Sequence, residues 1–211
     1  MTARPVYPKG RKSARKTLYF HALGIVVECK KQNGKLNFCE GYIYMNNWFT
    51  VEQIDFQTFA ISEYKHWEET HCYLLCGQKK AILIDTGLGV SNIKNIVDSL
   101  TELPVEVITT HVHWDHIGGH RYFDNIAVHE AEKEWLSVRF PIPLQIVKKN
   151  LTRLPCDFPV DFDIDAYQVF QGMPQRILQD GDFLELGGRE IQVIYTPGHS
   201  PRSEEHTSEL Q

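Results

Sequence analysis

The chain has 211 residues, of which 42% are hydrophobic and 23% charged, a size and balance that suit one globular domain and exclude a disordered or collagen-like protein. No apolar run approaches the roughly 18 residues of a membrane-spanning helix, so we expect no membrane partner. The chain has a net charge of −5, and its acidic part is residues 45–201, which carry twelve Lys and Arg against twenty-two Asp and Glu. Such an acidic segment repels phosphates, which argues against a nucleic-acid partner.

The two ends of the chain differ from its centre. Residues 1–44 hold nine Lys and Arg against two Asp and Glu, with an apolar stretch that lacks the cleavage site of a signal peptide. We therefore interpret residues 1–44 as a leader or as upstream sequence, with translation starting at Met45. Residues 202–211 match the in-frame translation of a sequencing-library adapter and are interpreted as an artefactual tail. The domain is thus expected over residues 45–201.

The first half of this domain alternates strands and a helix. Apolar and β-branched runs predict strands over 51–55, 58–62, 71–76 and 81–85, with the 71–76 and 81–85 pair forming a hairpin. Ser91 is then expected to cap a helix over 93–100, which Pro104 cannot continue. The remaining elements, in chain order, are predicted as strands 105–109 and 126–128, helices 130–138 and 144–151, and strands 176–178, 183–186 and 191–195. This order indicates an α/β fold.

The strand predicted at 105–109 is followed by His111-Val112-His113-Trp114-Asp115-His116. Imidazole and carboxylate groups suit zinc, and an extended His-x-His pair projects both rings to one side. Asp115 and His116 follow the turn and point to a neighbouring position, so this cluster suits two adjacent metal ions. Gly118-Gly119 is expected to let the backbone bend tightly beneath it.

The HxHxDH pattern is flanked by Ile-Leu-Ile-Asp85-Thr-Gly87 before it and Thr196-Pro-Gly-His199-Ser after it. In this order the motifs resemble the metallo-β-lactamase superfamily, and most closely its thioesterase-like and uncharacterised bacterial members. The resemblance implies an αββα sandwich. Because this chain supplies the first half and only the opening strands of the second, we expect the second half to be incomplete.

The resemblance also assigns roles to individual residues. It implies that His111, His113 and His199 bind a first zinc ion and that Asp115 and His116 contribute to a second. The family's later bridging Asp and final His have no counterpart here, so we expect two zinc ions in the intact family and at most one held firmly by this chain. Asp115 would also orient the nucleophile and help to protonate the leaving group. Asp85 would hold a metal ligand in position.

Other residues remain ambiguous from sequence. His71 is a candidate for the substrate cleft, and Trp114 is either a cleft wall or core. Buried packing or capping is expected for His66, His120 and His129, and for Cys72 and Cys76 on one strand face. The aromatic stretch 140–170 is either a lid or core packing.

The sequence therefore predicts a zinc-dependent hydrolase that uses a metal-bound hydroxide on a small ester, thioester or lactone. A small-molecule substrate fits the acidic charge better than a nucleic acid, and β-lactams are disfavoured because no export signal is found. The five cysteines form no CxxC pair, which favours a reducing, cytoplasmic location. Two alternatives stay open: an iron-dependent redox enzyme resembling persulfide dioxygenases, and a catalytically inactive fragment.

Overall fold

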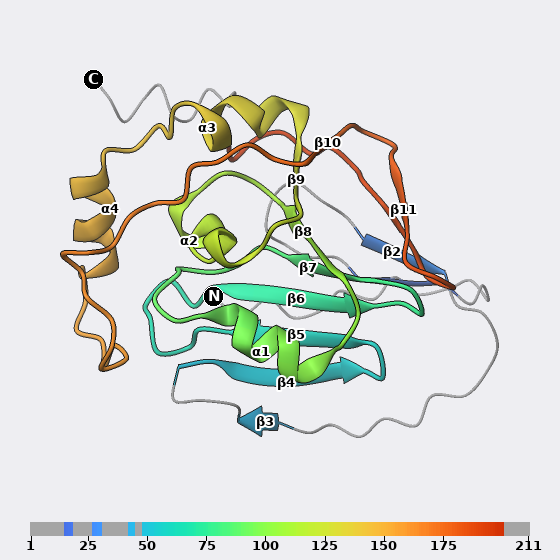
Figure 1. The fold of residues 1–211 in the computed structure, drawn as a ribbon, viewed down its shortest axis with the longest axis horizontal. Coiled ribbons are helices and arrows are strands. Elements are labelled where there is room, and N and C mark those ends of the chain that lie inside the picture. Colours follow the sequence, from blue (N-terminus) through green and yellow to red (C-terminus); the bar gives the residue numbers. More distant parts are fainter. Residues whose placement is uncertain (1–14, 19–26, 31–41, 45–47, 201–211) are drawn as a thin grey trace.

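The computed structural model describes residues 15–18, 27–30, 42–44 and 48–200 (Figure 1). The predicted tail 202–211 and most of the predicted leader therefore lie outside the described residues. Within the described part, the main feature is an eight-stranded mixed sheet. Its strands, in spatial order, are β10 (Arg176–Leu178), β9 (Ile126–His129), β8 (Val105–Thr109), β7 (Ala81–Ile84), β6 (His71–Cys76), β5 (Thr58–Ser62), β4 (Thr50–Asp55) and β3 (Tyr42–Tyr44).

Strand direction divides this sheet into two parts. Neighbouring strands are antiparallel from β3 to β7 and parallel from β7 to β10. The turn predicted between the 71–76 and 81–85 strands is present, since β6 and β7 form an antiparallel pair. Two separate two-stranded antiparallel sheets pair β1 (Arg15–Leu18) with β2 (Val27–Lys30), and β11 (Phe183–Glu185) with β12 (Glu190–Gln192).

The helices are short and follow the strands. Helix α1 (Ile93–Leu100) occupies its predicted span, but its N-cap is Asn92, whose side chain accepts a hydrogen bond from the Lys94 backbone N–H at 2.9 Å. The single helix predicted over 130–138 is instead a 3₁₀ turn followed by a short α-helix. The other helical segments are α2 (Trp114–Ile117), η1 (His120–Tyr122), η2 (Glu130–Glu132), α3 (Lys133–Ser137) and α4 (Leu144–Leu151).

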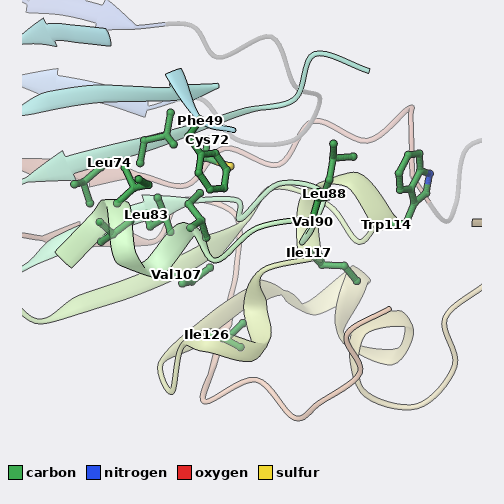
Figure 2. Packing of buried hydrophobic residues seen from close by; sticks show 14 of the residues in the cluster. Phe49, Cys72, Leu74, Leu83, Leu88, Val90, Val107, Trp114, Ile117 and Ile126 are labelled. Atoms are coloured by element: carbon green, nitrogen blue, oxygen red, sulfur yellow. The ribbon is translucent and has the colours of Figure 1, made fainter. Parts of the chain in front are cut away.

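Alternate side chains of the central strands point to opposite sides of the sheet. Both faces are apolar and both are covered. On one face, Leu83 and Val107 belong to the larger core cluster (Figure 2). Ile93 and Val97 of α1 are part of the same cluster. On the other face lies a second cluster that includes the β11–β12 hairpin: Ile82, Ile84, Ile108, Leu184 and Ile191. The chain thus forms a mixed α/β layered fold, as the sequence predicts.

The parallel part of the sheet sets the position of the candidate site. Strands β7, β8 and β9 run in one direction, so the loops that leave their carboxyl ends emerge at one edge. Ligands in open α/β sheets bind at this edge. Among the described residues, no helix is long and apolar enough to cross a membrane.

Candidate metal centre

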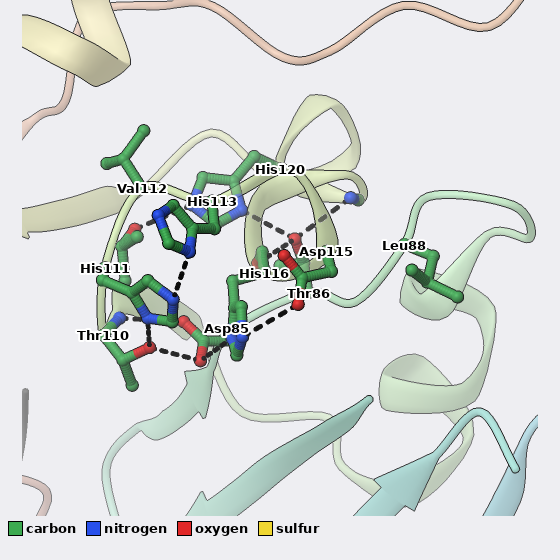
Figure 3. A network of polar contacts seen from close by, with 12 residues as sticks. Asp85, Thr86, Leu88, Thr110, His111, Val112, His113, Asp115, His116 and His120 are labelled. Atoms are coloured by element: carbon green, nitrogen blue, oxygen red, sulfur yellow. Dashed lines mark hydrogen bonds and ion pairs between the residues drawn. The ribbon is translucent and has the colours of Figure 1, made fainter. Parts of the chain in front are cut away.

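Three histidines from two distant segments converge at this edge of the sheet. His111 and His113 lie in the loop between β8 and α2, and His199 follows β12. One ring nitrogen from each lies within 4.8 Å of the others, and Figure 3 shows the rings of His111 and His113 turned toward each other. The sequence signature therefore corresponds to a real spatial cluster.

The donor set fits a zinc ion. His111 Nε2 and His113 Nδ1 are 3.2 Å apart, close to the separation of about 3.3 Å between two nitrogens bound to one tetrahedral zinc. Burial, reinforced by His116, His113 and His199, strongly lowers the pKa of His111. A neutral imidazole has the free lone pair that a metal ligand needs.

Asp85 connects the loops beneath this cluster. It follows β7 with φ of 58°, a left-handed conformation uncommon outside glycine. Its Oδ1 accepts a hydrogen bond from the Thr110 backbone N–H at 2.8 Å, and its Oδ2 accepts one from the Thr110 hydroxyl at 2.6 Å. The same Oδ2 lies 2.8 Å from His116 Nδ1. Asp85 is 1% exposed, so these contacts form away from water.

These contacts fix the tautomer of His111. The Thr110 hydroxyl donates its proton to Asp85, so its oxygen accepts from the His111 Nδ1 that lies 3.0 Å away. The proton on His111 is therefore on Nδ1, and the Nε2 lone pair faces His113. Asp85 also accepts from Nδ1 of His116, and one carboxylate thus orients two histidines.

Asp115 and His116 form the neighbouring pair, with His116 Nε2 3.3 Å from Asp115 Oδ2. Burial opposes charge on both groups, but their mutual attraction outweighs it. The pKa of Asp115 is lowered by His116, and the pKa of His116 is raised by Asp115 and Asp85. A metal bound here would displace the proton on His116 Nε2. The His111 and His116 ring centroids are 4.1 Å apart, so both groups adjoin the histidine cluster.

Gly118 is required for close packing rather than for the predicted tight bend. Gly118 has ordinary helical angles, φ −59° and ψ −35°. A Cβ on Gly118 would overlap the backbone of Leu88 and Gly89. The glycine is needed because the loop after β7 passes directly against the end of α2.

The remaining predicted residues lie as follows. His71 lies 2.8 Å from the Ser62 hydroxyl and packs edge-on against Tyr64, and Trp114 is 6% exposed within the core cluster. Thr86 and Thr109 each lie 2.7 Å from a different ring nitrogen of His120. The aromatic stretch 140–170 contributes core packing, and the same holds for Cys72 and Cys76.

Two buried carboxylates were missed by the sequence motifs. Glu63 is 1% exposed and accepts from Trp48 Nε1 at 2.6 Å and from the Leu88 backbone N–H at 2.8 Å. Glu132 is 4% exposed and accepts from the Val112 backbone N–H at 3.0 Å. The sequence offered one indication of Glu63, because this residue directly follows a predicted strand, 58–62, and that strand ends near the site.

Comparison with known proteins agrees with this geometry. A sequence model of the Metallo-beta-lactamase superfamily matches residues 67–203. The chain belongs to the metallo-beta-lactamase superfamily. This membership covers the span that contains every predicted metal ligand.

Relatives in the superfamily differ in their named activities. The acyl-coenzyme A thioesterase MBLAC2 of Homo sapiens is 30% identical over 169 residues, covering 72% of this chain and 60% of that protein. The N-acyl homoserine lactonase of Bacillus cereus is 26% identical over 160 residues, covering 62% of this chain and 54% of that protein. The chain thus spans about 60% of the length of the curated thioesterases that it matches.

A solved structure supports the fold. The beta-lactamase from Chitinophaga pinensis matches with a TM-score of 0.52 and 23% identity, covering 75% of this chain and 58% of that chain. At this identity, the match concerns the fold alone.

Proposed function

We propose that this chain is the metal-binding part of a hydrolase that cleaves a small thioester, ester or lactone with zinc as its cofactor. The observation that carries this proposal is the convergence of His111, His113 and His199, whose ligand atoms lie within 4.8 Å of one another. Three protein ligands leave a fourth position open, which is typical of catalytic rather than structural zinc.

The residues divide into two sets. His111, His113 and His199 would hold the first zinc ion, while Asp115 and His116 would contribute to a second. Bound zinc would lower the pKa of water and polarise the substrate carbonyl. Asp115, 8% exposed beside the cluster, would orient the attacking water and pass a proton to the leaving group. Asp85 would keep His111 and His116 in the orientation and tautomer that ligation requires.

A thioester is the favoured substrate class. The relatives at 30% identity are named acyl-coenzyme A thioesterases, and a thiolate leaves without prior protonation. Thioester hydrolysis therefore depends little on proton transfer from Asp115 to the leaving group. The acidic charge of residues 45–201 continues to disfavour nucleic acids.

The test is hydrolysis by the zinc-loaded 211-residue chain. Acyl-CoA and acyl-glutathione thioesters would be assayed with Ellman's reagent, beside an N-acyl homoserine lactone, nitrocefin and, with iron loaded, a persulfide. We expect thioester cleavage that falls at least about a hundredfold in His113→Ala. Asp98→Ala, which removes an exposed side chain of α1 that pairs with Lys94, is the control. Turnover of persulfide alone would establish the redox alternative, and no turnover by a folded, zinc-loaded chain would refute the proposal.

A further inference from the structure

The search for further function leads to Glu132, a buried carboxylate that the proposed chemistry does not use. Its Oε2 accepts a hydrogen bond from the Val112 backbone N–H at 3.0 Å, and its Oε1 accepts one from the Ser200 hydroxyl. Val112 lies between His111 and His113 in the sequence, and Ser200 directly follows His199. One side chain therefore contacts both segments that carry the clustered histidines.

We infer that Glu132 is a positioning residue that holds the His199 segment against the His111–His113 loop and so sets the spacing of the three imidazoles. The inference rests on the proposed function, because it concerns the same metal centre. It adds a determinant that lies outside the HxHxDH and Thr-Pro-Gly-His motifs.

The contact to Val112 is difficult to replace. Val112 is completely buried, so without Glu132 its N–H would lose this partner in a place remote from water. An unsatisfied buried donor is costly, and the loop would have to move to find another acceptor. Such a movement would shift both flanking histidines.

A second contact from the same short segment supports this assignment. The ring of His129, three residues before Glu132, stacks on Tyr195 with centroids 4.3 Å apart and planes 6° apart. Tyr195 lies four residues before His199. The turn 129–132 therefore contacts the His199 segment on both sides of the Thr-Pro-Gly sequence.

The environment of Glu132 combines burial with two accepted hydrogen bonds. Burial raises the pKa of Glu132, whereas the hydrogen bonds from Ser200 and Val112 oppose that shift. Residues that orient metal ligands typically change metal affinity by about 10–100-fold when removed. We expect an effect of this size from loss of the carboxylate.

The experiment measures metal binding by the full chain rather than turnover. Zinc affinity would be obtained by competition with a chromogenic chelator, and site geometry from the visible spectrum of the Co²⁺-substituted chain. Glu132→Ala is expected to weaken zinc binding about 10–100-fold and to alter the cobalt spectrum. Glu132→Gln should restore most of the affinity, because its amide can accept from Val112 and donate to the Ser200 oxygen. Glu134→Gln, an exposed carboxylate two residues away, is the matched control and should behave as wild type.

Further outcomes separate this inference from the proposed function. Wild-type affinity and spectrum in both Glu132→Ala and Ser200→Ala would overturn the inference, and Ser200→Ala decides if Glu132→Ala does not fold. Amide hydrogen exchange in the metal-free chain adds a readout that needs no metal: exchange at Val112 should accelerate in Glu132→Ala, and unchanged exchange would contradict the inference. A wild-type chain that binds zinc but hydrolyses nothing would refute the proposed function alone.

Discussion

Asp85 shows how one residue supports several others. Its left-handed backbone, φ of 58°, turns the chain at the end of β7 so that both carboxylate oxygens face the loop after β8. Strain of this kind persists where surrounding contacts hold it, and it often marks functional sites. Here those contacts go to Thr110 and His116.

Replacing Asp85 with Asn should disrupt metal binding more than folding. The amide can accept through only one atom, so it cannot serve both the Thr110 N–H and the pair of donors on Oδ2. We expect Asp85→Asn to lower zinc affinity or kcat by about 10–100-fold, measured by chelator competition and by thioester turnover. Asp98→Asn is the control, because the Asp98 carboxylate pairs with Lys94 on the exposed face of α1. An unchanged zinc affinity and kcat in Asp85→Asn would contradict the assigned role.

The raised pKa of Glu63 predicts how the free energy of unfolding depends on pH. Burial raises its pKa from 4.5 to about 7, opposed by Trp48 and the Leu88 N–H; Asp115 raises the pKa further and His116 lowers it. Between pH 4.5 and 7 the folded state then binds more protons than the unfolded state, so the free energy of unfolding falls as pH rises through this window. The free energy of unfolding therefore decreases by about 3 kcal/mol over this range.

The measurement is urea unfolding of wild type and Glu63→Gln in EDTA across this pH range. The glutamine cannot ionise, so the unfolding free energy of the variant relative to wild type should increase by about 3 kcal/mol from pH 4.5 to 7. Because glutamine also places an amide N–H against one of two donors, the variant should start less stable at low pH. A pH-independent difference would show that Glu63 titrates normally.

At the scale of elements, close packing of two loops positions the site. The loop after β7 contacts the end of α2, where Thr86 N–H donates to the His116 carbonyl at 2.8 Å and Gly118 N–H donates to the Gly87 carbonyl at 2.9 Å. Gly118→Ala should therefore cost about 3 kcal/mol, because the added methyl group meets backbone that cannot move aside. Gly181→Ala is the comparison, since its φ of 84° is unfavourable but no atom lies near its Cβ position.

Chemical denaturation would measure both glycine variants. Gly181→Ala should cost only about 1 kcal/mol, the penalty of a left-handed alanine. Gly118→Ala should in addition weaken zinc binding, since α2 begins directly after its N-cap residue His113. Equal losses of stability in the two variants would contradict the close-approach explanation.

The sequence predicted most elements because their patterns are local. Apolar and β-branched runs located the central strands, and α1 and α4 occupy their predicted spans. Helix α2 was missed because its four residues are too short to show periodicity. Asn92 rather than Ser91 caps α1, a choice between two adjacent capping residues that sequence alone does not make.

The site was predictable only where its residues form contiguous motifs. His111, His113 and His199 were brought together as the resemblance implied, although their roles as ligands stay a prediction. Glu63 and Glu132 depend on tertiary contacts with residues 25 and 20 positions away. No spacing in the sequence indicates such contacts, and isolated carboxylates are usually found on the surface.

At the scale of the whole molecule, the packed core and the candidate site occupy different parts of the sheet. Its two faces are covered by α1 on one side and by the β11–β12 hairpin on the other. Arg189, 7% exposed, ties this hairpin to the sheet by donating to the Gln57 carbonyl and the Thr58 hydroxyl, each at 3.0 Å. The carboxyl edge of β7 and β8 is left to the polar loops that carry the histidines.

This arrangement predicts the metal content of the 211-residue chain. Three imidazoles within 4.8 Å form one complete set, whereas Asp115 and His116 provide two protein ligands for a second ion. Affinity grows with the number of well-placed ligands, so we expect about one zinc ion per chain to survive dialysis against a competing chelator. Elemental analysis would measure this content. His113→Ala should lose that ion, while Asp115→Asn should retain it. Two ions that survive dialysis in the wild-type chain would contradict the one-ion prediction and indicate that other residues complete the second set.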